Sequence, residues 1–98
     1  MSEDMIQTIR DYLATQPVLK AWIFGSYARG EERDDSDVDL LVEFDHDNAT
    51  IGLFEHIRMI LALEERLGKT VDMVPSGTLP SYINQYVDND KHLIYTRQ

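Results

Sequence analysis

The sequence predicts one small domain of the α/β or α+β class, with three to four strands and helices packed against them. Segments with helical spacing of apolar residues alternate with short apolar runs of strand length, which is typical of layered folds of helices and a sheet. The chain has 98 residues, 43% of them apolar, which is enough for one modest core and argues against disorder. We therefore expect residues 1–98 to form a single domain.

The first third of the chain predicts a helix, a strand and a turn. Apolar residues recur at helical spacing over residues 3–15, and the run 18–24 has the bulk of a buried strand. Gly25 and Ser26 break that strand, and residues 27–36 follow as a short helical turn and a polar loop. The Gly-Ser turn is thus expected at the end of a strand.

A second strand and a long helix follow. Residues 37–44 are too apolar at their centre for a solvated loop, and residues 45–48 indicate a turn. Residues 50–67 predict a helix that ends at Gly68. We expect the inner face of this helix to include Ile51, Phe54, Ile57 and Leu61.

The last part of the chain predicts a strand, a helix and one ambiguous segment. Residues 71–74 form a short apolar strand, and Thr78 is expected to cap a helix with Pro80 in its first turn. Residues 92–95 fit either a final strand or an extended tail. The buried face of the last helix is expected to carry Leu79, Ile83, Tyr86 and Val87.

Composition narrows the function classes. The chain has no cysteine, which excludes disulfides and thiolate metal sites, and it has no apolar run as long as a membrane span. Its acidic N-terminus is unlike a signal peptide, so we expect a cytoplasmic protein. The net charge of −9, without a cluster of Lys and Arg, argues against long nucleic acids as partners. A basic protein, or a small nucleotide that arrives with cations, fits this charge better.

Three aspartates carry the strongest chemical signal. Asp37 and Asp39 are two residues apart on the predicted strand, so both side chains point to the same face. Adjacent carboxylates repel each other unless a cation lies between them, and Mg²⁺ is typically held by one or two carboxylates plus substrate phosphates. Asp72, in a later apolar strand, can supply a third carboxylate that binds one ion and accepts the proton of a nucleophile. The pattern predicts two Mg²⁺ ions that assist a phosphoryl displacement.

The turn after the first strand is the candidate phosphate site. Gly25 lets a phosphate approach the backbone closely, and Ser26 offers a hydroxyl and an N–H at the start of a helical turn. A P-loop is excluded, because Glu31 and Glu32 stand where Lys and Ser or Thr are required. Arg29, one turn further on, either reaches the same phosphates or pairs with one of these two glutamates. We expect the turn and Arg29 to form the nucleotide site.

The combination of Gly25-Ser26, ten residues, Asp37-x-Asp39 and a later Asp72 resembles the DNA polymerase beta-type nucleotidyltransferase superfamily. The form Gly-Ser-x-Ala-Arg-Gly and the short length resemble its minimal nucleotidyltransferases, or MNT proteins. The resemblance implies a nucleotidyltransferase fold, with helices against one face of a small mixed sheet. It also implies transfer of a nucleoside monophosphate from an NTP to a hydroxyl, with release of pyrophosphate. By this resemblance Asp37 and Asp39 bind both metal ions, Asp72 binds one, and Gly25 and Ser26 contact the triphosphate.

The resemblance, which spans about residues 18–75, also implies a partner. MNT proteins are commonly antitoxins of HEPN ribonuclease toxins, and some adenylylate a tyrosine of the toxin. The resemblance therefore implies an enzyme that moves AMP from ATP onto a HEPN toxin. An acceptor on a second protein also fits the short chain, which leaves little room for its own acceptor domain. Two alternatives stay open. One is an antitoxin that only covers the toxin's active site, and the other is transfer to a small molecule such as an aminoglycoside.

Overall fold

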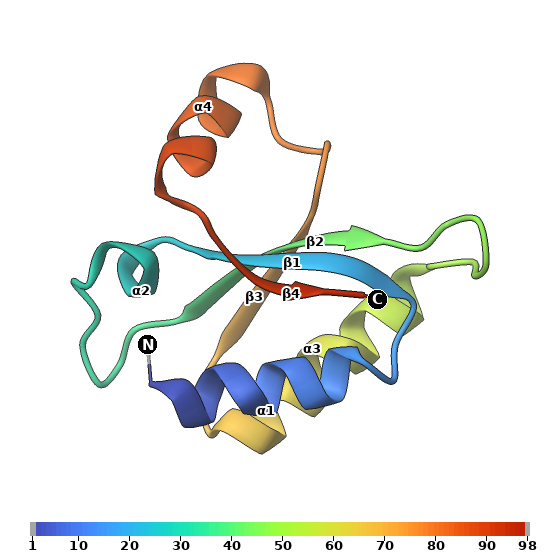
Figure 1. Cartoon of the computed structure of the whole chain (residues 1–98), viewed down its shortest axis with the longest axis horizontal. Helices are drawn as coiled ribbons and strands as arrows, with labels where there is room; N and C mark the ends of the chain where they lie inside the picture. The colour runs from blue at the N-terminus through green and yellow to red at the C-terminus, as the bar shows by residue number, and fades with distance from the viewer. Residues whose placement is uncertain (1, 98) are drawn as a thin grey trace.

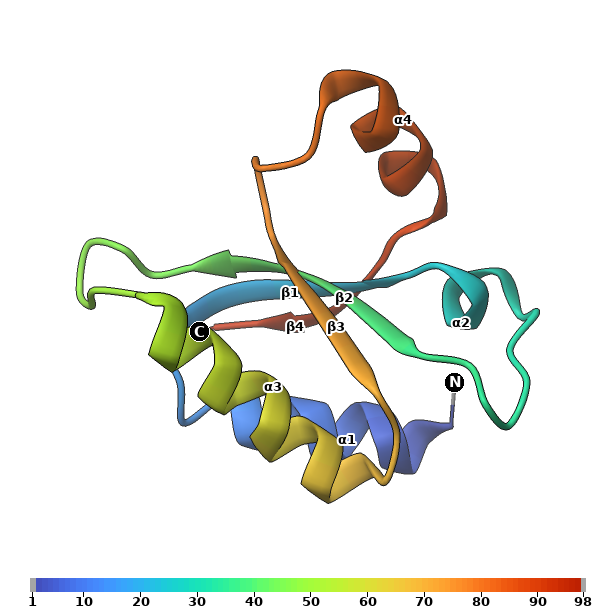
Figure 2. The same ribbon diagram turned by 180° about the vertical axis from the view of Figure 1, so that it is seen from behind.

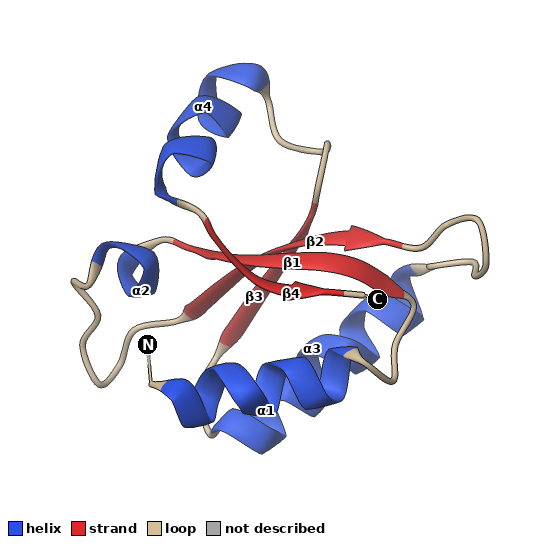
Figure 3. Cartoon of the chain, viewed as in Figure 1, coloured by secondary structure: helices blue, strands red, loops and turns tan. Residues whose placement is uncertain are grey.

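A computed structural model of the chain describes residues 2–97, which form four helices and four strands (Figure 1). The segment that was ambiguous in the sequence, residues 92–95, belongs to a fourth strand (Figure 3). In chain order the elements are α1 (Glu3–Leu13), β1 (Val18–Phe24), α2 (Ser26–Arg29), β2 (Val38–Phe44), α3 (Leu53–Leu67), β3 (Val71–Pro75), α4 (Ser81–Asp90) and β4 (His92–Thr96). The predicted class of helices packed on a small sheet is confirmed.

The strands form one mixed sheet in the order β3-β2-β1-β4. β2 and β3 are parallel, whereas β1 is antiparallel to both of its neighbours. A parallel pair needs a crossover connection, and α3 supplies it between β2 and β3. α1 and α3 lie on one side of the sheet and α4 lies on the other (Figure 1, Figure 2). The sheet therefore has one face covered by two helices and one face that is more open.

The main core lies between the sheet and the pair α1 and α3. The first side chains of β2 alternate between this core and the opposite face of the sheet. Val38, Leu40 and Val42 are fully buried, while Asp39 between them is only half-buried. The opposite face has a smaller buried group, Leu41 of β2 and Val87 of α4, outside the main core. Alternation along β2 thus directs Asp39 to the open face of the sheet.

The inner face predicted for the long helix is wrong for Phe54, Ile57 and Leu61, whereas Ile51 does pack against the core. Met59 and Leu63 are the buried residues of α3, whereas the predicted residues are exposed on the helix or, for Ile51, half-buried before it. The helix carries two apolar stripes, and a helix on a sheet buries only one of them. His56 helps to fix which one, since its Nε2 lies 2.7 Å from the carbonyl oxygen of Met73 on β3. The large apolar side chains of α3 that are exposed are Leu53, Phe54, Ile57 and Leu61.

The predicted start and buried face of the last helix are also wrong in part. α4 begins at Ser81 with Pro80 at its N-cap position, because Thr78 lies in a preceding turn and donates its hydroxyl to the carbonyl of Pro75 at 2.7 Å. Val87 is buried as expected. Three other predicted members, Leu79, Ile83 and Tyr86, are half-buried or exposed. The helix covers the open face of the sheet with little more than one side chain.

A buried acid ties the end of the chain to the sheet. Asp45 follows β2 and is 4% exposed. Its Oδ2 accepts hydrogen bonds from Nη1 of Arg97 at 3.0 Å and from Nδ2 of Asn48 at 2.8 Å. Arg97 also donates its backbone N–H to the carbonyl oxygen of Leu19 on β1 at 2.8 Å.

Within residues 2–97 no helix is long and apolar enough to cross a membrane.

Candidate active site

Two of the three predicted acids are direct neighbours in the sheet. Asp39 on β2 and Asp72 on β3 are register partners of the parallel pair. Their strand neighbours Val38, Leu40 and Val71 are buried, so both aspartates project from the open face of the sheet. The fold therefore brings together two carboxylates that lie on different strands, with the whole of α3 between them in the chain.

Asp37 lies one residue before β2, whereas the sequence placed it on the strand itself. It is exposed, and its carboxylate is close enough to act electrostatically on Asp39. The pKa of Asp39 is raised first by burial of its carboxyl and then by the negative charges of Asp72 and Asp37. The charge of Arg29 acts in the opposite direction. Three acids and one cation thus share one electrostatic neighbourhood.

Gly25 lies against the carboxylate of Asp39. Phe24, the residue before it, pairs with Asp39 across β1 and β2. Gly25 has φ 73° and ψ −151°, a region that only glycine adopts readily. A Cβ atom built at this position would lie 2.2 Å from Oδ2 of Asp39. The glycine of the turn therefore makes room for the carboxylate as well as for any bound phosphate.

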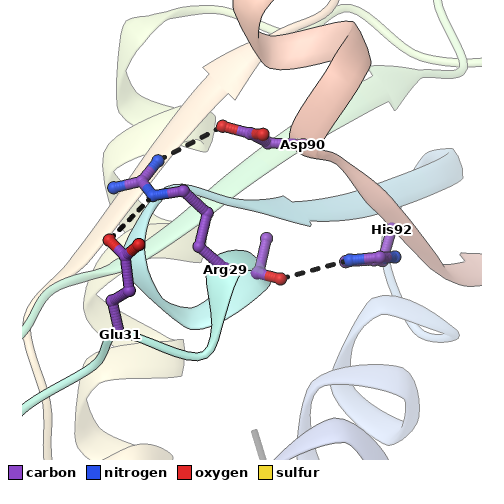
Figure 4. A network of polar contacts seen from close by, with 5 residues as sticks. Arg29, Glu31, Asp90 and His92 are labelled. Carbon is purple, nitrogen blue, oxygen red and sulfur yellow. Dashed lines mark hydrogen bonds and ion pairs between the residues drawn. The ribbon is translucent and has the colours of Figure 1, made fainter.

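Ser26 and Arg29 are the first and last residues of α2. The hydroxyl of Ser26, which is half-buried, has no hydrogen bond to any other part of residues 2–97. Arg29 donates from Nε to Glu31 at 3.1 Å and from Nη1 to Asp90 at 3.3 Å (Figure 4). The surface pair with Glu31, one of the two alternatives for Arg29, is therefore present, and the charge of Arg29 also acts on Asp39.

Asp90 and His92 are residues near the site that the sequence did not indicate. Asp90 ends α4 and reaches Arg29, while Nε2 of His92 lies 3.2 Å from the carbonyl oxygen of Ala28 (Figure 4). Neither contact follows from a spacing, since each joins residues more than 60 positions apart. Only the course of α4 and β4 places them beside α2.

The donor set fits a hard divalent cation that also binds phosphate. Asp37, Asp39 and Asp72 offer only carboxylate oxygens, and Mg²⁺ combines such ligands with waters and substrate phosphates. Among residues 2–97, no three His, Cys, Asp or Glu side chains lie close enough to hold a metal ion by themselves. The acids are therefore a partial ligand set, which waters and phosphate oxygens would have to complete.

The chain is similar in sequence to known nucleotidyltransferases. The family model of polymerase beta nucleotidyltransferases matches residues 7–98. A protein of Methanocaldococcus jannaschii, provisionally named a protein adenylyltransferase, is 39% identical over 74 residues, which cover 74% of this chain and 71% of that protein.

Three solved structures share the fold. A provisionally described minimal nucleotidyltransferase is 35% identical with a TM-score of 0.76, over 91% of this chain and 88% of that one. A toxin-antitoxin structure with AMP-PNP is 21% identical with a TM-score of 0.79, over 95% and 74% of the two chains. A complex of a tri-AMPylated Shewanella oneidensis HEPN toxin with its MNT antitoxin is 20% identical with a TM-score of 0.63, over 97% and 69%.

Proposed function

The chain belongs to the polymerase beta family of nucleotidyltransferases, and on this premise we propose that it transfers AMP from ATP to a hydroxyl of a protein partner. The observation that carries the proposal is the register pair of Asp39 and Asp72, with Asp37 and the Gly25 turn beside it. A related protein provisionally named a protein adenylyltransferase and a structural neighbour with an AMPylated HEPN toxin support the choice of nucleotide and acceptor. We infer that this chain is an antitoxin that modifies a tyrosine of a HEPN toxin.

In the proposed reaction a tyrosine oxygen of the partner attacks the α-phosphorus of ATP. The new P–O bond forms as the bond to the β-phosphate oxygen breaks, and pyrophosphate leaves. Asp72, which is exposed, accepts the phenolic proton. Two Mg²⁺ ions would supply charge stabilisation to the attacking and leaving oxygens. The sites assigned to them are Asp37 and Asp39 for both ions, and Asp72 for one.

The turn and Arg29 are proposed to orient the triphosphate. Gly25 leaves its backbone open, and Ser26 has a hydroxyl that is available for a phosphate oxygen. Arg29 adds a guanidinium whose planar N–H groups match phosphate geometry. Since the reaction uses ATP, we place the protein in the cytoplasm.

Label transfer tests the proposal directly. The protein is incubated with ATP that carries a radioactive α-phosphate, Mg²⁺ and the product of its neighbouring gene, and the labelled protein band is identified. We expect transfer by the wild type and none by Asp37→Ala/Asp39→Ala. The proposal is wrong if ATP gives no label, or if the double variant labels the partner as well as the wild type does.

A second candidate function is neutralisation by binding alone. The net charge of −9 and the exposed apolar side chains of α3 favour a protein-binding surface. In that case Asp37→Ala/Asp39→Ala still protects cells from the toxin. Loss of protection while the complex still forms, as judged by co-purification, selects the enzymatic function.

A further inference from the structure

Arg29 is held by two carboxylates from distant parts of the chain. Its Nε and Nη1 atoms donate to Glu31 and Asp90, at 3.1 Å and 3.3 Å, so the guanidinium is fixed at two of its three nitrogens (Figure 4). Nη2 and the second Nη1 hydrogen have no partner among residues 2–97. The contacts set the plane of the guanidinium and leave part of its donor edge free.

A second contact fixes the backbone that carries Arg29. The imidazole of His92 lies 3.2 Å from the carbonyl oxygen of Ala28, one residue before Arg29 (Figure 4). Asp90 and His92 flank the junction between α4 and β4, so this junction holds both the backbone and the side chain at the end of α2. The cation near the aspartates is therefore positioned from outside its own helix.

These contacts are poorly suited to a purely stabilising role. The side chains of Arg29 and Asp90 are 44% and 37% exposed, and ion pairs this open to water contribute little to stability. Their main consequence is geometric, because they favour one orientation of an arginine that would otherwise sample many rotamers. The orientation matters because Arg29 lies one turn after the candidate phosphate site, and its backbone N–H donates to the carbonyl oxygen of Gly25 at 3.2 Å.

We propose that Asp90 is a positioning residue that orients the Arg29 guanidinium toward the triphosphate of the nucleotide. This inference rests on the proposed function, in which Arg29 binds that triphosphate. Asp90 touches neither nucleotide nor acceptor in this scheme. It acts through Arg29, because it restricts the arginine before phosphate binds. The arginine then loses less conformational freedom on binding. Glu31 shares the task from the loop that follows α2.

The test measures binding of Mg²⁺ with α,β-methylene-ATP, an analogue that cannot be cleaved at the reacting bridge, by calorimetry on the full chain. Asp90→Asn removes the charge that holds Arg29. Asp88→Asn is the matched control, because it removes the same charge from the same helix. Asp88 pairs with Lys91 at 2.8 Å instead of with Arg29. Thermal melting of each variant checks that the fold is intact.

We expect Asp90→Asn to weaken binding about three- to tenfold, while Asp88→Asn stays within about twofold of the wild type. Asp90→Glu should restore most of the affinity. In an Arg29→Gln background, Asp90→Asn should have no further effect, because the residue acts only through Arg29. A purely structural role would change the melting temperature and would not depend on Arg29.

Two results overturn the inference while leaving the proposed function intact. One is equal binding by the Asp90→Asn and Asp88→Asn proteins. The other is a loss with Asp90→Asn that persists unchanged in the Arg29→Gln background. If the wild type itself binds no Mg²⁺-nucleotide, the proposed function falls and the inference with it.

Discussion

Gly25 and Asp39 are in such close contact that a Cβ atom on residue 25 would lie 2.2 Å from Oδ2 of the aspartate. The contact joins the turn after β1 to the acid on β2, so the candidate phosphate site packs directly against a candidate metal ligand. The Cβ atom on residue 25 would also lie 3.1 Å from Cγ and 3.3 Å from Cβ of Asp39. A rotation of the carboxylate alone therefore does not relieve the overlap.

The first prediction is that Gly25→Ala abolishes nucleotide transfer and destabilises the fold. The substitution forces a backbone conformation reserved for glycine and displaces Asp39, with an expected cost of about 3 kcal/mol in the free energy of unfolding. Gly30→Ala is the matched control, since Gly30 has φ +72° but a methyl group at this position would meet nothing within 4 Å. It should cost about 1 kcal/mol and keep activity. Urea denaturation and label transfer measure both, and equal activity losses would contradict the prediction.

The second prediction is that Asp39→Asn stabilises the metal-free protein near pH 7. Burial and the charges of Asp72 and Asp37 raise the pKa of Asp39 above its ordinary 3.8, so the native state holds this proton more tightly than the unfolded chain does. That stability is present below about pH 3.8 and is lost as pH rises through the raised pKa. At neutral pH the charged aspartate is therefore a cost that asparagine removes.

Melting curves in EDTA from strongly acidic to neutral pH measure the effect of Asp39→Asn. We expect a higher Tm than the wild type near neutral pH, worth less than about 1 kcal/mol because the site is partly solvated, and a gap that closes at the acidic end. Glu43→Gln removes the same charge from the same strand as a control and should not raise Tm. Added Mg²⁺ should stabilise the wild type more than the Asp39→Asn protein. A Tm gap that is independent of pH would refute the electrostatic cause.

The sequence was sufficient for the features that depend on local patterns. Strand alternation identified Asp39 as facing away from the core, and the Gly25-Ser26 break was placed correctly at the end of β1. The register that sets Asp39 opposite Asp72 needed the parallel pairing, which no local pattern specifies. The ion pair between Arg29 and Asp90 depends on the path of α4, so its partner was missed.

Helix faces were harder to predict for a physical reason. α3 carries two apolar stripes, one through Met59 and Leu63 and one through Ile57 and Leu61. Both have helical spacing, so periodicity alone does not decide which one packs on the sheet. In the structure the stripe through Met59 and Leu63 packs on the sheet, and His56 of the same helix contacts β3.

The third prediction uses this pair of stripes. Leu63 is fully buried and Leu61 is 58% exposed on the same helix, so the two leucines form a matched test. Leu63→Ala should lower the free energy of unfolding by about 2–4 kcal/mol, because it removes buried apolar surface and leaves a cavity. Leu61→Ala should cost less than about 1 kcal/mol. Chemical denaturation of both proteins decides the orientation of α3, and a larger loss at residue 61 would reverse the assignment.

The fourth prediction concerns the buried acid that holds the end of the chain. Asp45→Ala leaves Arg97 and Asn48 without the acceptor they share, and should cost about 2–3 kcal/mol. Asp47→Ala is the control, since it removes the same charge from an exposed position in the same turn. Arg97 also bonds to the backbone of Leu19. We therefore expect Asp45→Ala to speed amide hydrogen exchange, relative to the wild type, more in β4 than in β2. Hydrogen exchange measures this directly, and uniform loss of protection across the sheet would show that Asp45 supports the whole domain instead of anchoring β4.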